Sequence, residues 1–314
     1  MVKKKNKGKR IISIFVLVLL LGGIGWAWSI WARIYDNPPE DDDYVRDETI
    51  VDEPDKDITN VMILGVDQRD NEAGRADTII VMSINNDTDE IAMISIPRDS
   101  RVEIPGRGLD KINHAMAFGG VNLLRATVEK LLGVPIHHYV YTNFSGFQSI
   151  VNTLGGVTLD VERRMTVGKE GDLGKVTLQP GVQKLNGLEA LAYVRFRNDS
   201  ENDFGRMRRQ QDFLKAVADE VLQAKSLLKL PQLMEQTAKF VRTDMSITQS
   251  LNFARRAASL NFNQIETITL NGSGKMISGV SYVLLNQEFL LQTVNSYLRW
   301  NTEGAVINEN HVKN

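Results

Sequence analysis

The sequence predicts an α/β protein: a three-layer α-β-α domain with a mixed central sheet, preceded by one N-terminal transmembrane helix. Short apolar runs bounded by turn formers alternate with longer stretches of helical periodicity, which predicts strands alternating with helices. The runs are apolar throughout, and this is typical of strands that are covered on both faces. An uncharged run of 21 residues near the N-terminus is long enough to cross a membrane as a helix.

The first 31 residues predict where the chain lies in the cell. Residues 1–10 carry six basic side chains and no acid, and residues 11–31 carry no charge. Basic flanks stay in the cytoplasm, so we expect a single-pass type II signal anchor in the cell membrane, with the rest of the chain extracellular. A cleaved signal peptide is the alternative, but the apolar run is long for one and no A-x-A-like cleavage site follows it.

Beyond the expected anchor, the chain divides by composition. Residues 32–57 are expected to form an acidic juxtamembrane linker, since they contain three prolines and no periodicity. An acidic metal site there is the alternative, but nothing in the pattern would fix its geometry. Residues 58–300 are expected to form one globular domain, and residues 301–314 a C-terminal tail. The absence of cysteine excludes disulfides, thiolate nucleophiles and Cys-zinc sites.

The first half of the domain is expected to alternate strands with helices. Strands are predicted at 61–66, 78–84 and 90–96, and the turn formers at 85–89 join the last two as a hairpin. A helix follows over 114–133, where Gly133 with Pro135 beyond it is a stop signal. A strand at 137–143, a helix at 144–156 and a strand at 157–162 complete this half.

The second half is expected to be mainly helical. Residues 186–197 are predicted to form a short helix that runs into a strand. Helical stretches occupy roughly 206–260, and a helical subdomain at 212–260 is an open alternative. A last strand is predicted at 266–270 and a last helix at 286–300.

Five arginines fall between positions 195 and 209, although the chain beyond residue 31 is acidic, with a formal charge of −8. On the predicted strand, Arg195 and Arg197 point to the same face, because side chains alternate with period two. On a helix that begins near Gly205, Arg206 and Gln210 lie together at the first turn, where free N–H groups and the helix dipole favour anions. Guanidinium groups bind phosphate oxygens in a planar, two-pronged way, so the cluster indicates a phosphate site.

Two other interpretations of the arginine cluster stay open. A solvated basic face would pair with the neighbouring acids, which are Asp199, Glu201 and Asp203. A nucleic-acid surface fits poorly, because the domain is acidic and is expected outside the cell.

Acidic side chains adjoin two of the predicted strands. Asp67 directly follows the first strand, and Asp77 lies just before the second. Ligands tend to bind in the crevice beyond strand ends, so two carboxylates facing the arginines suggest a divalent cation that bridges to phosphate. Turn-forming aspartate is the alternative for both residues. Arg98 and Asp99 follow the third strand, where Pro97 ends regular pairing and leaves Arg98 on a loop.

Seven motifs occur in order between residues 61 and 211: LGVDQR, GRADTI, SIPRDSRVEIPG, DKINHAMAFGG, NFSGF, LGGV and YVRFR with DFGRMRRQQ. Together they resemble the LytR-CpsA-Psr family of Gram-positive cell-wall enzymes. The resemblance implies a magnesium-dependent phosphotransferase, with manganese as the alternative ion. Such an enzyme moves an anionic glycopolymer, a wall teichoic acid first among them, from an undecaprenyl-diphosphate carrier to the muramic-acid 6-hydroxyl of peptidoglycan. The expected partners are this donor, the peptidoglycan acceptor and the cell membrane, with no nucleic acid.

The resemblance also implies roles for single residues. Asp67 and Asp77 match the magnesium-binding aspartates of the family, and Arg98 matches its essential arginine at the diphosphate. Asp77 or Asp99 would act as the catalytic base for the acceptor hydroxyl. The other residues expected at the diphosphate are Arg75, Arg195, Arg197, Asp203, Arg206 and Gln210. Two nearby candidates without an assigned role are Lys111 and Arg209.

Two functions without turnover remain as alternatives. One is a membrane-anchored regulator, a transcriptional attenuator, which the anchor, the acidic domain and the missing helix-turn-helix spacing disfavour. The other is an envelope module that binds polyprenyl lipids. A long apolar cavity is expected from the family, but its lining cannot be identified, because core and cavity residues look alike in the sequence.

Overall fold

The computed structural model describes residues 29–35, 57–67, 74–168, 175–197, 202–222, 235, 238, 240–246, 248–250, 253 and 265–300. No helix within these residues combines the length and the apolar character needed to cross a membrane. Most of the expected anchor, most of the expected linker and the whole expected tail lie outside the described ranges, at residues 1–28, 36–56 and 301–314.

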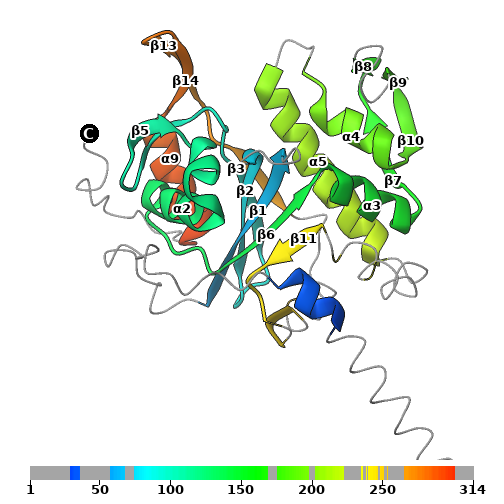
Figure 1. The fold of residues 1–314 in the computed structure, drawn as a ribbon, viewed down its shortest axis with the longest axis horizontal. Helices are drawn as coiled ribbons and strands as arrows, with labels where there is room; N and C mark the ends of the chain where they lie inside the picture. Colours follow the sequence, from blue (N-terminus) through cyan, green and yellow to red (C-terminus); the bar gives the residue numbers. More distant parts are fainter. Residues whose placement is uncertain are drawn as a thin grey trace, which may run out of the picture.

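A six-stranded sheet forms the centre of the domain (Figure 1). In spatial order its strands are β11 (Val241–Thr243), β6 (His138–Asn143), β1 (Ile58–Asp67), β2 (Arg75–Asn85), β3 (Ile91–Ser95) and β12 (Glu266–Thr269). β1 is parallel to β6 and β3 is parallel to β12, while the other neighbours are antiparallel. The predicted mixed sheet is therefore confirmed, as is the hairpin that joins β2 to β3.

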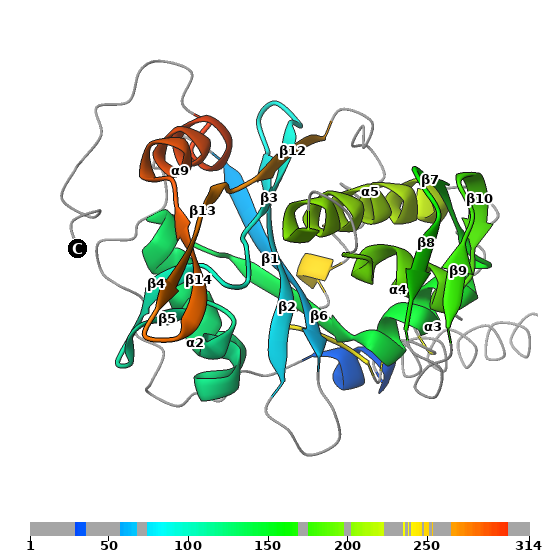
Figure 2. The same ribbon diagram turned by 90° about the horizontal axis from the view of Figure 1, so that it is seen from above.

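Helices cover both faces of the sheet (Figure 2). One face carries α2 (His114–Leu132), α9 (Gln287–Thr293) and the π-helix η2 (Val294–Leu298), and the other carries α3 (Phe144–Leu154), α4 (Gly187–Arg195) and α5 (Asn202–Leu222). Side chains alternate along β1, so Met62 and Leu64 share an apolar cluster with Leu124 of α2, whereas Ile63 belongs to another cluster with Ile80. Cover on both faces explains why the strands are apolar throughout.

The predicted strand at the end of residues 186–197 is wrong, because this segment is helical as far as Arg195. Asn186 and Glu189 form a reciprocal capping box that begins α4. All side chains from Ala190 to Val194 are buried, and a helix that is apolar on every side shows the same run of letters as a buried strand. Phe196 is extended and ends the helix.

The remaining predicted helices have clear counterparts. Gly133 ends α2 with a left-handed φ of 64°, and its N–H donates to the Glu129 carbonyl at 2.7 Å. Gly119 and Gly120 leave helical geometry and kink α2 near its start. α3 matches the helix predicted at 144–156, and α9 with η2 matches the one at 286–300. α5 begins at Asn202, earlier than predicted, and most of residues 223–264 lie outside the described ranges.

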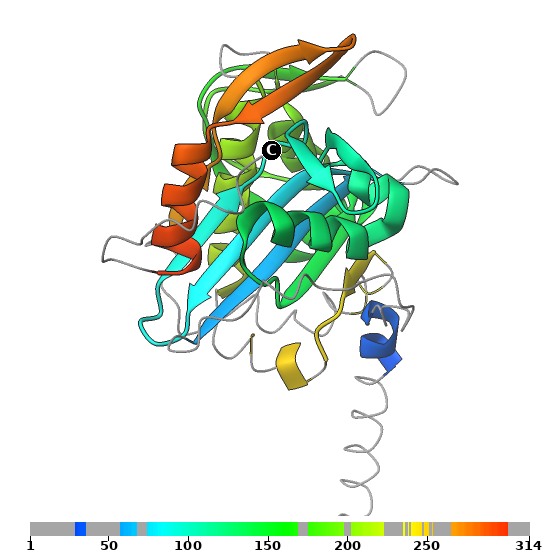
Figure 3. The ribbon, with the colours of Figure 1, turned by 90° about the vertical axis from the view of Figure 1, so that its left-hand side faces the viewer.

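Four two-stranded ribbons surround the sheet in the described part of the chain, and the sequence predicted only one of their strands, at 157–162. They are β4 (Arg101–Ile104) with β5 (Gly108–Lys111), β7 (Val157–Val161) with β10 (Gly181–Leu185), β8 (Met165–Val167) with β9 (Val176–Leu178), and β13 (Gly272–Ile277) with β14 (Val280–Leu285). The last ribbon follows β12, so 266–270 is not the last strand as predicted. In this ribbon β13 is largely exposed and β14 is half-buried, and neither shows the regular apolar alternation that marks a strand in the sequence. Figure 3 shows it projecting at the end of the domain opposite residues 29–34.

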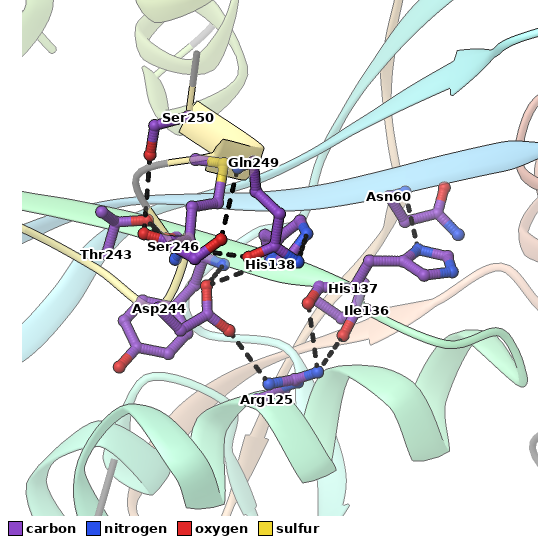
Figure 4. A network of polar contacts seen from close by, with 12 residues as sticks. Asn60, Arg125, Ile136, His137, His138, Thr243, Asp244, Ser246, Gln249 and Ser250 are labelled. Carbon is purple, nitrogen blue, oxygen red and sulfur yellow. Dashed lines mark hydrogen bonds and ion pairs between the residues drawn. The ribbon is translucent and has the colours of Figure 1, made fainter. Parts of the chain in front are cut away.

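A polar network attaches the edge strand β11 to β6 and to α2 (Figure 4). The Tyr139 N–H donates to Asp244 Oδ1 at 2.9 Å, and the Thr243 hydroxyl donates to the Tyr139 carbonyl at 2.7 Å. Arg125 of α2 donates to Asp244 Oδ2 at 3.2 Å and also to the Ile136 carbonyl. The Asp244 and Arg125 side chains are 10% and 14% exposed, so this ion pair is largely shielded from water.

We expect Asp244→Ala to lower the free energy of unfolding by about 3 kcal/mol, because it removes the acceptor shared by the Arg125 guanidinium and the Tyr139 N–H. A loss of this size lowers Tm by roughly 6–12 °C in a domain of this length, which thermal unfolding followed by circular dichroism would measure. Asp160→Ala is the matched control, since Asp160 is exposed on β7, and its Tm should stay within about 2 °C. Equal shifts for the two variants would contradict the role of the network.

Candidate active site

A cavity of about 550 Å³ lies between the sheet and the helices α3, α4 and α5. Its apolar lining consists of Ile63, Ile80, Val140, Phe144, Phe147, Ile150, Val167, Leu191, Val194, Phe213, Leu214, Val217 and Val241. Its polar lining consists of Asp67, Asp77, Thr78, Arg98, Thr142, Asn143, Arg195, Arg197, Arg206 and Gln210. A volume of this size is typical of small-molecule sites, which are mostly apolar with a few polar groups that orient the ligand.

Along α5 and along β1, the polar and the apolar residues that line the cavity occupy different ends of the element. Along α5, the polar Arg206 and Gln210 come one to two turns before the apolar Leu214. Along β1, the apolar Ile63 precedes Asp67, which is the last residue of the strand. Polar groups therefore gather at one end of the cavity, where β1 ends and α5 begins. We call this end the mouth.

Two carboxylates enter the mouth from neighbouring strands. Asp67 ends β1, and Asp77 lies near the start of β2. The pairing of the two strands shifts register between Gly65 and Val66, and Asp77 is the residue of β2 left without a partner there. Such a bulge redirects a side chain, and both aspartates line the cavity.

Arg98 lies in the turn after β3 and joins the carboxylates. Its Nη1 donates to Asp77 Oδ1, and its Nε lies 3.6 Å from Asp99 Oδ2. Asp99 does not line the cavity, because its Oδ1 faces Lys111 Nζ at 2.8 Å. Of the two predicted candidates for the base, only Asp77 therefore lies in the cavity.

Three further arginines reach the mouth from the other layer. Arg195 is the last residue of α4, and its guanidinium lies 4.8 Å from the centre of the Phe144 ring. Arg197 follows two residues later, and Arg206 enters from α5. Phe196, between these two arginines, is buried at 4% exposure. Because α4 continues to Arg195, the two arginines face the cavity from the end of a helix and not from a strand.

Arg209 has a different position and fixes the backbone at Phe196. Its side chain is fully buried, with 0% exposure. Nη2 donates to the Phe196 carbonyl at 2.8 Å, Nη1 donates to Glu162 Oε1 at 2.8 Å, and the guanidinium lies 5.2 Å from the centre of the Phe196 ring. Arg208 also lies 3.3 Å from Glu162, on the surface. Both of these arginines pair with Glu162, which is distant in sequence and is not one of the neighbouring acids predicted to pair with the cluster.

The structure brings together seven of the residues predicted for the site: Asp67, Asp77, Arg98, Arg195, Arg197, Arg206 and Gln210. Arg75 is exposed, pairs in register with Asp67 and does not line the cavity. Asp203 lies in the first turn of α5, and its side chain is outside the described part of the structure. The polar Thr78, Thr142 and Asn143 also line the cavity and were not predicted, although the turn from a strand into a helix at NFSGF was a signal for the last two.

The side chains of Tyr193 and Asp212, which do not line the cavity, have raised pKa values. Burial, followed by the charges of Asp212 and Glu162, raises the pKa of the Tyr193 phenol well above its usual value. Burial also raises the pKa of the Asp212 carboxyl, against the opposing charges of Arg208 and Lys215. Neither raised group lines the cavity, and the Tyr193 hydroxyl stays protonated at neutral pH, so it supplies no base.

Comparison with known proteins identifies the family. The sequence model of the LytR_cpsA_psr family matches residues 34–298. The polyisoprenyl-teichoic acid–peptidoglycan teichoic acid transferase TagU of Oceanobacillus iheyensis is 35% identical over 302 residues, which cover 91% of this chain and 92% of that protein.

Solved structures give the same result. TagT bound to LI-WTA has a TM-score of 0.64 at 34% identity, covering 78% of this chain and 91% of that one. The LytR-CPS2A-psr family protein YwtF (TagT) with bound octaprenyl pyrophosphate lipid has a TM-score of 0.60 at 34% identity, covering 78% and 90%. The protein described here therefore belongs to the LytR_cpsA_psr family.

Proposed function

We propose that the protein is an extracytoplasmic phosphotransferase that attaches an anionic glycopolymer to peptidoglycan from a polyprenyl-diphosphate carrier. The single observation that carries the proposal is the cavity, which joins an apolar interior to a mouth with four arginines. A polyprenyl diphosphate has the matching chemistry, since it is a long apolar chain that ends in anionic phosphates. Two relatives support the proposal: one is a teichoic acid transferase by name, and the other holds octaprenyl pyrophosphate lipid.

The finer parts of the proposal concern the two substrates. The donor would carry a wall teichoic acid on undecaprenyl diphosphate, and the acceptor would be the muramic-acid 6-hydroxyl. The name of the TagU relative supports both a teichoic acid and peptidoglycan. Residues 11–31 would hold the protein in the cell membrane, with the domain outside the cell, where both substrates meet.

The arginines at the mouth would bind the two phosphates of the donor. Phosphoryl transfer builds charge on the phosphate oxygens, and fixed guanidinium groups in a site shielded from water stabilise that charge. Arg98 Nη1 donates to Asp77 Oδ1, so this arginine is held at the mouth beside a carboxylate. We expect its guanidinium to bind a phosphate oxygen of the donor. Arg75, exposed beside the mouth, would meet donor groups that remain outside the cavity.

The two cavity-lining aspartates fit a magnesium ion that binds together with the donor. Within the described residues, no group of three or more His, Cys, Asp or Glu side chains could hold a metal ion. Magnesium characteristically uses one or two protein carboxylates, substrate phosphates and waters, so Asp67 and Asp77 suffice to hold it. When bound, the ion would neutralise charge on the phosphate oxygens, as would manganese.

The proposed transfer forms one phosphorus–oxygen bond and breaks another. The acceptor oxygen attacks the phosphorus that carries the glycopolymer, the bond to the bridging oxygen breaks, and polyprenyl phosphate leaves. Positioning and charge stabilisation are sufficient for such a step, so no protein nucleophile is needed. We assign the proton of the acceptor hydroxyl to Asp77, because Asp99 does not line the cavity.

Arg98→Ala and Asp77→Ala are each expected to lower kcat by about 10²–10³-fold, because each removes a charged group at the reacting phosphates. The assay would combine the full chain in detergent micelles with a polyprenyl-diphosphate-linked sugar, peptidoglycan oligomers and Mg²⁺. Chelation of the metal should abolish transfer. The exposed Arg163 gives the matched control, and Arg163→Ala should keep the unaltered rate.

The same assay tests the second of the two alternatives, a module that binds polyprenyl lipids without turnover, which the apolar interior of the cavity also suits. Tight binding of the donor by the unaltered protein, with no transfer to any acceptor offered, would favour that alternative. A loss of activity accompanied by a large fall in Tm would mean that Arg98 or Asp77 maintains the fold instead.

Ile150→Trp is expected to raise KM for a long-chain donor by about tenfold and to leave a short-chain donor less affected. The larger ring would occupy part of the apolar interior, and excluding roughly 60 Å² of lipid from it costs about 1.5 kcal/mol of binding free energy. The measurement is KM for donors of increasing chain length, with Ile150→Val as the control that does not fill the cavity. Equal effects on long and short donors would place the lipid chain elsewhere.

A further inference from the structure

Four charged side chains form a row of ion pairs that leads out of the cavity. Lys111 Nζ lies 2.8 Å from Asp99 Oδ1, Asp99 Oδ2 lies 3.6 Å from Arg98 Nε, and Arg98 Nη1 donates to Asp77. Arg98 and Asp77 line the cavity, whereas Lys111 and Asp99 do not. Within this row, the outer pair therefore adjoins Arg98 and not the cavity itself.

The projecting ribbon β13–β14 fixes the outer pair from the other side. The Val283 N–H donates to the Asp99 carbonyl at 2.9 Å, and Val283 forms a bridge with Ser100. Lys111 Nζ lies 5.9 Å from the centre of the Tyr282 ring, within the range of a cation–π contact. β14 thus contacts both the backbone at Asp99 and the ammonium of Lys111, and the Asp99 carboxylate lies between two cations, Lys111 and Arg98.

We propose that Lys111 is a positioning residue: by pairing with the Asp99 carboxylate it keeps the Arg98 guanidinium directed into the cavity. Lys111 holds the Asp99 carboxylate at 2.8 Å, while the Arg98 Nε stays at 3.6 Å. Without the ammonium, the carboxylate would have Arg98 as its nearer cation and would draw the guanidinium outward, away from Asp77. The inference rests on the proposed phosphotransferase function, because the row serves Arg98 at a donor phosphate.

A double-mutant cycle distinguishes positioning from direct binding. Lys111→Met is expected to lower kcat by about tenfold with a smaller effect on KM, because a misdirected Arg98 weakens stabilisation of the transition state. Lys111→Arg should restore most of the rate. Adding Asp99→Asn to Lys111→Met should also recover most of the loss, because a neutral amide no longer attracts Arg98.

The controls separate this effect from damage to the fold. Lys130→Met removes another lysine of an ion pair, 2.9 Å from Glu103 and exposed, and should leave kcat within about twofold. Tm is measured for every variant, and Lys111→Gln replaces Lys111→Met if the latter does not fold. If kcat falls further when Asp99→Asn is added to Lys111→Met, Lys111 acts on the substrate directly and the inference is overturned. An unchanged kcat for Lys111→Met would also overturn it.

A binding measurement keeps the inference testable if no transfer is detected. Absence of product from the unaltered protein would count against the proposed function alone. Affinity of the full chain for farnesyl diphosphate would then be measured by calorimetry. Lys111→Met should weaken it about fivefold and the added Asp99→Asn should restore it, whereas equal affinities across the set would overturn the positioning role.

Discussion

Four guanidinium groups converge on one end of a single cavity, and the repulsion among these like charges is the constraint that the rest of the site must meet. Arg98 is held by the Asp77 carboxylate, and Arg195 rests on the negative face of the Phe144 ring. The buried Arg209 donates to the Phe196 carbonyl, and this bond helps to hold the backbone between Arg195 and Arg197 in place against the repulsion. A ligand with two phosphates therefore meets charges that are already in place.

The fold was predictable where hydrophobic pattern and chain-breaking residues agree. The run VMILGV lies in β1, and the glycine after LeuLeu at 131–132 ends α2 where the stop signal places it. The prediction was wrong at 193–197, because complete burial of a helix removes the periodicity that distinguishes it from a strand. The ribbon β13–β14 was missed for another reason: none of its residues is fully buried, and GSGKMI and VSYVLL show no regular alternation of apolar and polar residues.

The site was predictable only in its polar half. Charged residues at the ends of apolar strands indicate a site, because an isolated charge is costly to bury and is therefore rare beside a core unless it binds a partner. The apolar lining was not predictable, since Leu214 and Ile80 have the same chemistry whether they face a core or a cavity. The contact of Arg209 with Glu162 spans 47 positions, and only the packing of α5 on the β7 end reveals it.

Both edges of the central sheet end in short strands. Within the described residues β11 has three residues, one of which, Thr243, bridges to Tyr35, and β12 has four, so each described edge strand offers few backbone groups to an approaching chain. Short edge strands are poor templates for the addition of a further strand, which is the first step of sheet-to-sheet aggregation. The described edges of the sheet are therefore poor starting points for edge-to-edge joining between copies of this domain.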